Sequence, residues 1–288
     1  MKIKIASRSS KLALKQVEEF NKTFSIKDYD LVKIFTRGDK LSAEGEMLFD
    51  KGSFVKDIEE LILNGSVDVA IHSAKDMPAK KTKGLKHLYF LENSKRKIKD
   101  LLIFRKDIEP KFKSEMKLGT SSLRRKMQAK FHMNEINIEP LNGNIDTRIK
   151  KLNDGQYDCI ILAEAGLSRL NFLLNGQNFL SLSHMTCSGQ GVLAVQWKEG
   201  TKAESFIESS QIYKDMAKLN KAISMERELL VELNADCNSA ISLFASENYL
   251  IGEIYGIESF ISFSGNNIDE ILKDIHNNNG TKLLHEHI

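Results

Sequence analysis

The sequence is short of cysteine, with three residues in 288, at Cys159, Cys187 and Cys237. They are widely spaced and form no Cys-x-x-Cys pattern, which argues against a disulfide framework and against a zinc site. Prolines also number only three, so composition does not mark linkers between domains. No run approaches the roughly 18 apolar residues of a membrane-spanning helix, and residues 1–7 lack the apolar core of a signal peptide. We therefore expect a cytoplasmic protein that contacts no membrane.

An excess of charge of one sign is also missing. Lys and Arg total 42 and Asp and Glu total 39, which leaves a net charge of +3. So small a net charge does not indicate a nucleic acid or an anionic membrane as a partner. With 41% hydrophobic and 28% charged residues the composition is globular, and the length allows two or three domains. Any cationic binding site must therefore be local.

Arginine is scarce relative to lysine, with nine residues against 33. A guanidinium group binds carboxylates and phosphates through two parallel hydrogen bonds, which an ammonium group cannot form. Each arginine is therefore a candidate for a specific binding role. We interpret Arg96, Arg105 and Arg227 as ordinary surface cations. The other six fall near predicted loop or helix ends: Arg8, Arg37, Arg124, Arg125, Arg148 and Arg169.

Apolar runs alternate with amphipathic segments in two successive passes. The first pass predicts strands at 2–6, 31–35 and 67–71 and helices at 13–24 and 54–62, the latter ending at a left-handed Asn64-Gly65 stop. The second predicts strands at 101–104, 117–119, 136–138 and 159–162 and helices at 122–130 and 147–152. Apolar strands with helices between them are typical of parallel sheets covered on both faces, which we predict here.

The two passes share a short pattern, because Gly65–Ile71 resembles Gly155–Ile161. We predict two similarly built α/β domains, with a chance match of two short segments as the alternative. A long helical pattern from Asp215 then precedes strands at 241–245, 249–255 and 259–263 and a last helix at 268–275, which indicates an antiparallel sheet with helices on one face. The predicted domains are 1–97 with 190–212, then 98–189, then 213–288.

Polar clusters follow the predicted strands of the first two domains. In open α/β sheets ligands bind beyond the carboxyl ends of the strands, so these clusters are the candidate site. The clusters are Ala6–Ser10, Thr36–Asp39, Ser73–Asp76, Gly119–Arg125 and Ala163–Arg169.

The cluster Gly119–Arg125 combines two ways of binding an anion. Thr120 or Ser121 can cap the following helix and leave backbone N–H groups pointing outward, while Arg124 and Arg125 add full charges on the first turn. This pattern indicates an acidic ligand. The alternative is a capped helix with solvated arginines.

Asp76 differs from its neighbours, because a lone carboxylate among cations does not help to bind an anion. A carboxylate in a cleft can stabilise a developing cation or move a proton. The alternative is a surface pair of Lys75 and Asp76, which would be worth little.

The three cysteines differ in placement. Cys237 lies in a polar loop, where it is either a working thiol or an incidental one, and only its exposure and pKa decide which. Cys159 lies inside an apolar run and is predicted to be buried and inert, whereas Cys187 is ambiguous. The tail His285-Glu-His287 has no further ligand nearby, so we interpret it as a frayed terminus rather than a metal site.

Seven short motifs follow one another along the chain: Ala6–Ala13, Thr36–Asp39, Lys51–Phe54, His72–Pro78, Gly119–Arg125, Gly143–Arg148 and Gly189–Gly191. Any one motif alone would be weak, but their order is specific. With these motifs in this order the chain resembles the porphobilinogen deaminase, or hydroxymethylbilane synthase, family, and the resemblance covers almost the whole chain.

The resemblance implies a fold and an activity. It implies two domains like those of periplasmic binding proteins with the active cleft between them, plus a small C-terminal α+β domain, in a monomer. It also implies a transferase that joins four porphobilinogen units head to tail, releases ammonia at each addition and finally frees hydroxymethylbilane. The family extends its product on a dipyrromethane cofactor, held by a thioether to the cysteine that matches Cys237.

The resemblance also assigns roles, with Asp76 as the catalytic carboxylate that stabilises a cationic substrate fragment through pyrrole N–H groups. No metal is implied. Cofactor binding is implied for Cys237, Lys75, Ser73, Ser121, Ser122, Arg124, Arg125, Arg148, Asp39 and Lys51. Substrate binding is implied for Arg8, Ser10, Gln16, Phe54, Arg169 and Gln190.

Three departures from the family pattern affect details. Asn142 stands where the family usually has arginine, Ala235–Ser242 lacks the usual glycine and proline around the thiol, and Glu92–Asp100 lacks an Asp-Pro-Arg-Asp run. The rival function is a non-catalytic, two-lobed protein that binds a small anion, since a fold does not fix a function. Such a binder would not need both Cys237 and Asp76.

Overall fold

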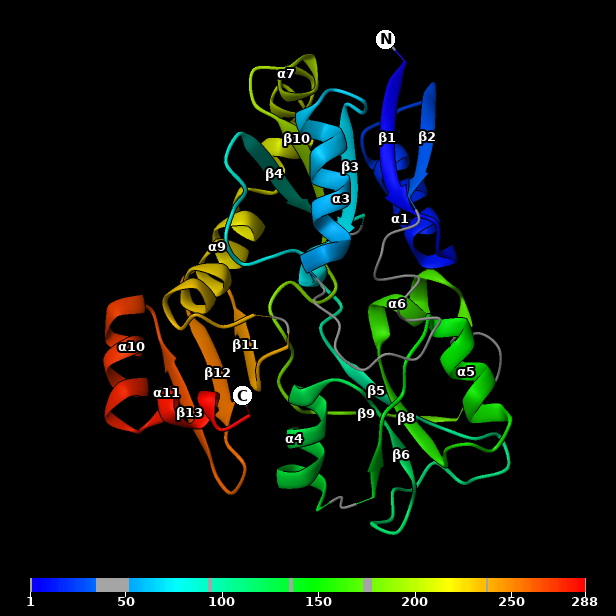
Figure 1. The fold of residues 1–288 in the computed structure, drawn as a ribbon, viewed down its shortest axis with the longest axis vertical. Coiled ribbons are helices and arrows are strands. Elements are labelled where there is room, and N and C mark those ends of the chain that lie inside the picture. The colour runs from blue at the N-terminus through cyan, green and yellow to red at the C-terminus, as the bar shows by residue number, and fades with distance from the viewer. Residues whose placement is uncertain are drawn as a thin grey trace.

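The protein is described from a computed structural model that covers residues 2–34, 52–92, 95–134, 137–172, 178–236 and 238–287. Three sheets organise the chain, and helices pack beside each of them (Figure 1). We call the three units lobe 1, lobe 2 and the C-terminal unit, after the sheet that each contains. The domain bounds given above stay a prediction.

Lobe 1 is built on a five-stranded sheet of order β2-β1-β3-β10-β4. β1, β2 and β3 are parallel, and β10 runs antiparallel to both of its neighbours. The strands are β1 (Ile3–Arg8), β2 (Tyr29–Ile34), β3 (Val69–Ser73), β4 (Leu85–Phe90) and β10 (Leu193–Lys198). The helices are α1 (Lys11–Thr23), α3 (Gly52–Leu63), α7 (Lys202–Glu208) and α8 (Gln211–Asp215).

Lobe 2 repeats this arrangement in a sheet of order β7-β6-β8-β5-β9, in which β5 is the antiparallel strand. Its strands are β5 (Asp100–Phe104), β6 (Leu118–Gly119), β7 (Ile138–Glu139), β8 (Cys159–Ala163) and β9 (Phe179–Ser181). Its helices are α4 (Leu123–Met133), α5 (Ile145–Asn153) and α6 (Glu164–Arg169). The strands β3 and β8, which carry the pattern shared by the two passes, occupy the central position of their sheets.

The prediction of parallel sheets in the two lobes was wrong in one respect, because the sheet of each lobe contains one antiparallel strand. In both lobes that strand is the first one after the chain crosses from the other lobe: β5 follows β4, and β10 follows β9. A strand that enters from the opposite end of a sheet must run against its neighbours. The antiparallel strands are thus the result of a chain that passes twice between two lobes.

The strand that leads to Asp76 is shifted by two residues from its predicted position at 67–71. Val67 closes a turn with its N–H on the carbonyl of Leu61, and the Asp68 carboxylate accepts a hydrogen bond of 2.8 Å from the N–H of Lys4. β3 therefore begins at Val69 and extends to Ser73. The three-residue turn η1 (Ala74–Asp76) follows at once.

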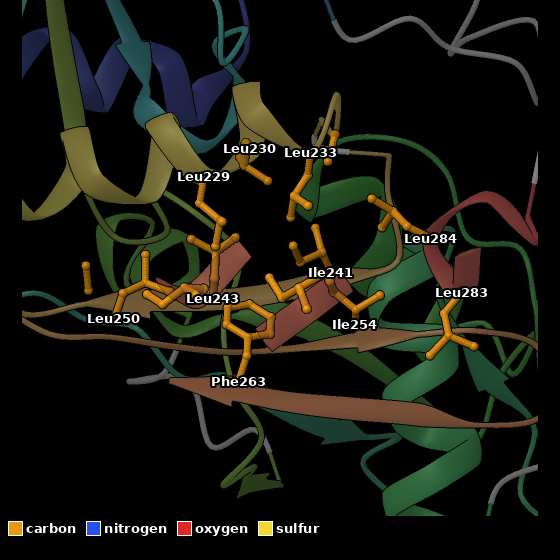
Figure 2. Close-up of a cluster of buried hydrophobic side chains, with 14 of the residues drawn as sticks. Leu229, Leu230, Leu233, Ile241, Leu243, Leu250, Ile254, Phe263, Leu283 and Leu284 are labelled. Atoms are coloured by element: carbon orange, nitrogen blue, oxygen red, sulfur yellow. The ribbon is translucent and has the colours of Figure 1, made fainter. Parts of the chain in front are cut away.

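The C-terminal unit has the predicted antiparallel sheet, of order β11-β12-β13. Its strands are β11 (Ile241–Ala245), β12 (Leu250–Tyr255) and β13 (Phe260–Gly265), and its helices are α9 (Ala217–Glu232), α10 (Ile268–Asn277) and α11 (Gly280–His285). Figure 2 shows the core between them, where Leu229 and Leu230 of α9 meet Leu243, Ile254 and Phe263 of the sheet. The fold class was confirmed: two similarly built α/β lobes and a small α+β unit.

The interpretation of the C-terminal tail as frayed was wrong. Leu283 and Leu284 of α11 are buried, the Glu286 carboxylate accepts a hydrogen bond of 2.7 Å from the N–H of Ile257, and His287 Nε2 lies 3.0 Å from the carbonyl oxygen of Tyr255. Apolar side chains ahead of the two histidines anchor the tail to the sheet. Among the described residues, no cluster of His, Cys, Asp or Glu could hold a metal ion. None of the described helices is long and apolar enough to cross a membrane.

Candidate active site

A cavity of about 390 Å³ lies where the three units meet, a volume typical of small-molecule sites. Lobe 1 lines it with the ends of β1 and β3 and the start of α1, and lobe 2 with α6 and the starts of α4 and α5. Residues 187–192, which cross between the lobes, form a further wall. The C-terminal unit adds Asp236 and Asn238, the two neighbours of Cys237.

Every predicted site residue with a described side chain lines this cavity. The predictions for Asp39, Lys51 and Cys237 fall outside the described residues, and only the backbone of Phe54 is described, within α3. The residues brought together are Arg8, Ser10, Gln16, Ser73, Lys75, Asp76, Ser121, Ser122, Arg124, Arg125, Arg148, Arg169 and Gln190.

Asp76 stands out among the cavity carboxylates. It ends the η1 turn directly after β3 and is half-buried. Within the described part of the chain, no group donates a hydrogen bond to its carboxylate or forms an ion pair with it. Its acceptor oxygens are therefore available to a ligand that carries N–H donors.

The neighbours of Asp76 on β3 and η1 are held in place by lobe 1. Ser73 Oγ accepts a hydrogen bond of 2.8 Å from the buried amide Nε2 of Gln16. Burial lowers the pKa of Lys75, while the Asp76 and Cys187 side chains oppose this shift. A ligand carboxylate beside Lys75 would act in the same direction as Asp76 and favour the charged form of the amine.

Arg124 and Arg125 line the cavity, but both are paired with the carboxylate of Asp100, for which no role was predicted from the sequence. Arg124 Nη2 lies 2.8 Å from Asp100 Oδ2, and Arg125 binds Asp100 through two bonds, Nη2 to Oδ1 at 2.7 Å and Nε to Oδ2 at 3.0 Å. All three side chains are buried. Burial opposes the ionisation of Asp100, but the two guanidinium groups outweigh it and hold its pKa well below the usual range.

The predicted cap of the α4 helix was wrong. Ser122 occupies the N-cap position without a capping hydrogen bond from its side chain. Ser121 Oγ instead accepts a bond of 2.8 Å from the N–H of Leu141, and Thr120 Oγ1 accepts one of 3.3 Å from the N–H of Ser122. These serine and threonine side chains stabilise the loop before the helix, because the neighbouring segment 140–144 supplies a donor within reach.

Arg148 is the lobe 2 arginine whose charge is least compensated. Its Nε donates a hydrogen bond of 2.7 Å to the carbonyl of Gly143, and no described carboxylate pairs with it. Burial lowers the pKa of Arg148 to about 10; the charge of Arg125 adds to the shift and Asp76 opposes it. The guanidinium remains charged at neutral pH and would gain from a ligand carboxylate.

Gln190 and Ser10 line the cavity and also form hydrogen bonds within the protein. The Gln190 side chain is fully buried, donates 2.9 Å bonds to Asp100 Oδ1 and to the carbonyl of Ile98, and accepts a weak bond from Cys187 Sγ at 3.6 Å. Ser10 Oγ caps α1 by accepting a bond of 3.2 Å from the N–H of Ala13.

Two arginines that we interpreted as surface cations are not on the surface: Arg227 is buried, and the side chain of Arg96 is only 10% exposed, so that interpretation was wrong for both. Arg227, on α9, donates a 2.7 Å bond to the carbonyl of Met77 and a second bond to that of Ala74, which fixes the turn that carries Asp76. Arg96 is paired with the fully buried Glu226 through Nη1 to Oε1 at 2.6 Å. Arg105 is paired near the surface with Asp107. The scarcity of arginine was the available signal for Arg96 and Arg227.

The lining carries an excess of positive charge. Seven of its described side chains are cationic and three are carboxylates. Burial lowers the pKa of the lining residue His72 to about 4, so this imidazole is neutral at pH 7. The cations are Arg8, Lys75, Arg124, Arg125, Arg148, Arg169 and Arg227, and the carboxylates are Asp76, Asp146 and Asp236. A ligand with several carboxylates fits this balance.

Comparison with known proteins identifies the class of ligand. Residues 3–205 match the family model described as porphobilinogen deaminase, dipyromethane cofactor binding domain. The chain belongs to the porphobilinogen deaminase family. It is 36% identical over 275 residues to the porphobilinogen deaminase of Streptococcus sanguinis strain SK36, covering 90% of this chain and 86% of that protein. It is also 36% identical over 275 residues to that of Helicobacter acinonychis strain Sheeba, covering 90% and 84%.

Membership of the porphobilinogen deaminase family makes the chain an enzyme of tetrapyrrole biosynthesis with a dipyrromethane cofactor. The rival function, a non-catalytic anion-binding protein, loses its support. Among solved structures, the effector-binding domain of BenM with benzoate is 10% identical, with a TM-score of 0.44, and the match covers 76% of this chain and 93% of that one. A likeness of that size carries no argument about activity.

The described residues fit the cofactor of the porphobilinogen deaminases. Each of its two pyrroles carries an acetate and a propionate, and the cavity offers an excess of cations to receive them. Asp236 and Asn238 bring the chain on either side of Cys237 to the cavity wall. The Asp76 carboxylate, to which none of the described residues donates a hydrogen bond, suits the pyrrole N–H groups.

Proposed function

We propose that this enzyme is a transferase that joins four porphobilinogen units head to tail with release of ammonia and frees hydroxymethylbilane by hydrolysis. A dipyrromethane on a thioether at Cys237 would supply the pyrrole carbon to which the first unit is added. The observation that carries the proposal is the Asp76 carboxylate, which has no hydrogen-bond or ion-pair partner among the described residues and lies inside a cavity with an excess of cations.

The chain's own residues would divide the work according to charge. Cations at the cavity wall would neutralise the acetate and propionate groups that accumulate as the product grows. Lys75 and Arg148 are the best placed of these, since burial lowers the pKa of each and a ligand carboxylate would offset that cost. Arg124 and Arg125 would contribute less charge than their number suggests, because Asp100 already pairs with both.

Asp76 would act on the reacting atoms. When ammonia leaves porphobilinogen, positive charge develops on the remaining methylene-pyrrole fragment, and a nearby carboxylate that accepts the pyrrole N–H bonds stabilises that charge. The same carboxylate can take up the proton that the attacked pyrrole carbon loses afterwards. Arg227 would serve as a positioning residue, because it fixes the carbonyl groups of the η1 turn on either side of Asp76.

We also propose roles for the other residues that the family resemblance assigned to binding. Ser73, Ser121 and Ser122, with Asp39 and Lys51, would assist in holding the cofactor, while Arg8, Ser10, Gln16, Phe54, Arg169 and Gln190 would contact the substrate. We further propose that the enzyme acts as a cytoplasmic monomer and binds no nucleic acid.

Intact-mass measurement of the purified wild type, Cys237→Ser and Asp76→Asn, together with porphobilinogen consumption, tests the proposal. The wild type should carry the added mass of two pyrrole units and consume porphobilinogen, and Cys237→Ser should carry no added mass and be inactive. Asp76→Asn should keep bound pyrroles but turn over about 100-fold or more slowly, because its amide cannot balance positive charge. An unmodified and inactive wild type, or near-normal turnover of Asp76→Asn, would contradict it.

A further inference from the structure

An ion pair joins the two lobes beside the cavity. Glu19 lies on α1 of lobe 1, and Arg169 is the last residue of α6 in lobe 2; these two helices lie against each other (Figure 1). Arg169 Nε lies 3.0 Å from both carboxylate oxygens of Glu19. The two side chains are only 13% and 14% exposed, so solvent screens the pair weakly.

The ion pair with Glu19 engages one edge of the Arg169 guanidinium group. Glu19 takes the Nε–H, and Nη2 donates a bond of 3.3 Å to the carbonyl of Gly191. Among the described residues, Arg169 Nη1 has no hydrogen-bond partner, and Arg169 lines the cavity whereas Glu19 does not. An entering carboxylate therefore meets the Nη1 side of an arginine whose Nε edge and charge are already engaged.

We propose that Glu19 sets the affinity of this site, because it competes with substrate carboxylates for Arg169, and that it ties the two lobes together at this edge of the cavity. The inference rests on the proposed function, in which Arg169 contacts porphobilinogen. A guanidinium binds a carboxylate most tightly when two adjacent N–H groups face it side by side. While Glu19 holds Nε and the carbonyl of Gly191 holds Nη2, a substrate carboxylate must either displace Glu19 or bind mainly through Nη1.

This competition suits an enzyme that must hold each new unit and then let it move on. An uncompensated, poorly solvated arginine would retain every carboxylate that reached it, whereas an internal carboxylate offers the guanidinium an alternative partner. Burial raises the pKa of Glu19, with Arg169 opposing the shift.

The neighbouring Glu18 provides a matched control. It sits one residue earlier on the same helix, its side chain is 59% exposed, and it pairs with Lys15 on its own helix rather than with lobe 2. Glu18→Gln and Glu19→Gln change the net charge and the helix composition equally. Only the second removes a carboxylate from Arg169.

Steady-state kinetics of the cofactor-loaded enzyme test the inference. Glu19→Gln should lower the KM for porphobilinogen about 3- to 10-fold, the effect of an ion-pair competitor worth roughly 1 kcal/mol, while Glu18→Gln should leave it unchanged. Because Glu19 acts through Arg169, adding Glu19→Gln to Arg169→Gln should produce no further change in KM. An unchanged or raised KM in Glu19→Gln, or an equal effect in the Arg169→Gln background, would overturn the inference.

A second readout does not depend on turnover. Small-angle X-ray scattering without substrate should give a larger radius of gyration for Glu19→Gln than for the wild type and Glu18→Gln, because the tie between the lobes is lost. Equal radii for all three proteins would overturn the tie. A wild type that carries pyrroles and consumes porphobilinogen keeps the proposed function intact in either case, whereas an inactive, unmodified wild type contradicts the function itself.

Discussion

Individual carboxylates decide how the cations of the cavity are used. Asp100 is buried between Arg124 and Arg125 and holds both side chains in one geometry. Asp76, in contrast, has no hydrogen-bond or ion-pair partner among the described residues and is left to act on a ligand. The same residue type thus has a structural task in one place and a proposed catalytic task in the other, according to what surrounds it.

Replacing Asp100 should destabilise the protein strongly. Asp100→Asn leaves two buried guanidinium groups without their counter-charge, and we expect the free energy of unfolding at pH 7 to fall by about 3–5 kcal/mol. Urea unfolding measures the change. Asp107→Asn is the control, because it removes a carboxylate from a solvent-exposed pair with Arg105 and should have little effect. Similar losses in both variants would contradict this prediction.

The difference in the free energy of unfolding between the wild type and Asp100→Asn should change with pH in one direction. Because the pKa of Asp100 is depressed in the folded protein, its contribution to stability is complete above the ordinary aspartate pKa near 3.9 and is lost as the pH falls towards the folded-state value. The gap between the wild type and Asp100→Asn should therefore stay constant from pH 7 to about pH 5 and shrink in stronger acid.

At the scale of elements, two segments cross between the lobes, one from β4 to β5 and the other from β9 to β10. These two crossing segments are packed against each other. Gly191, with φ of +83°, lies so close to residue 97 that a Cβ atom there would stand 2.2 Å from the carbonyl oxygen of Lys97. Arg96 Nε donates a bond of 2.9 Å to the carbonyl of Gln190, and Glu226 accepts one of 2.8 Å from the N–H of Gly189. Helix α9 thereby fixes the crossing next to the cavity.

Gly191→Ala should cost far more stability than an alanine at another left-handed glycine. The new methyl group meets backbone atoms that cannot move without shifting the other crossing, so we expect a loss of about 3–5 kcal/mol in the free energy of unfolding. Gly200→Ala is the control, since Gly200 has φ of +74° and nothing within 4 Å of the added atom. It should lose only about 1–2 kcal/mol, from backbone strain. Equal losses in urea unfolding would show that the close approach does not matter.

At the scale of the whole molecule, two lobes and a third unit gather an excess of positive charge around one cavity, although the chain as a whole has a net charge of only +3. Each unit alone would present a few scattered cations. Their combination produces a local field that attracts a carboxylate-rich substrate and weakens as salt screens it.

Raising the salt concentration should therefore weaken substrate binding. Between about 0.05 and 0.5 M NaCl we expect the KM for porphobilinogen to rise several-fold and kcat to change less, because screening acts mainly on the approach and binding of the anion. Initial-rate measurements at both salt concentrations check this, with the urea midpoint as a control for folding. A KM that does not change or falls with salt would contradict the role given to the cavity charge.

Local patterns predicted the elements well, but not how the strands pair. The strands at 241–245 and 159–162 and the helix after Ser122 could be predicted because apolar periodicity is a property of the segment itself. The antiparallel direction of β5 and β10 could not, since it depends on which lobe the chain comes from. The start of β3 was missed because Asp68 bonds to Lys4, a partner 64 residues away.

The sequence by itself determined the family, the two α/β passes with their α+β extension, and the group of polar loops that meet at one cavity, because ordered motifs and strand-end positions are properties of the linear chain. Only the tertiary structure decided the pairing of the charges. Arg124 and Arg125 meet Asp100, Arg169 meets Glu19 and Arg96 meets Glu226, across separations from 24 to 150 residues. The energy of a charge depends on burial and on the nearest opposite charge, and both arise only when distant segments pack.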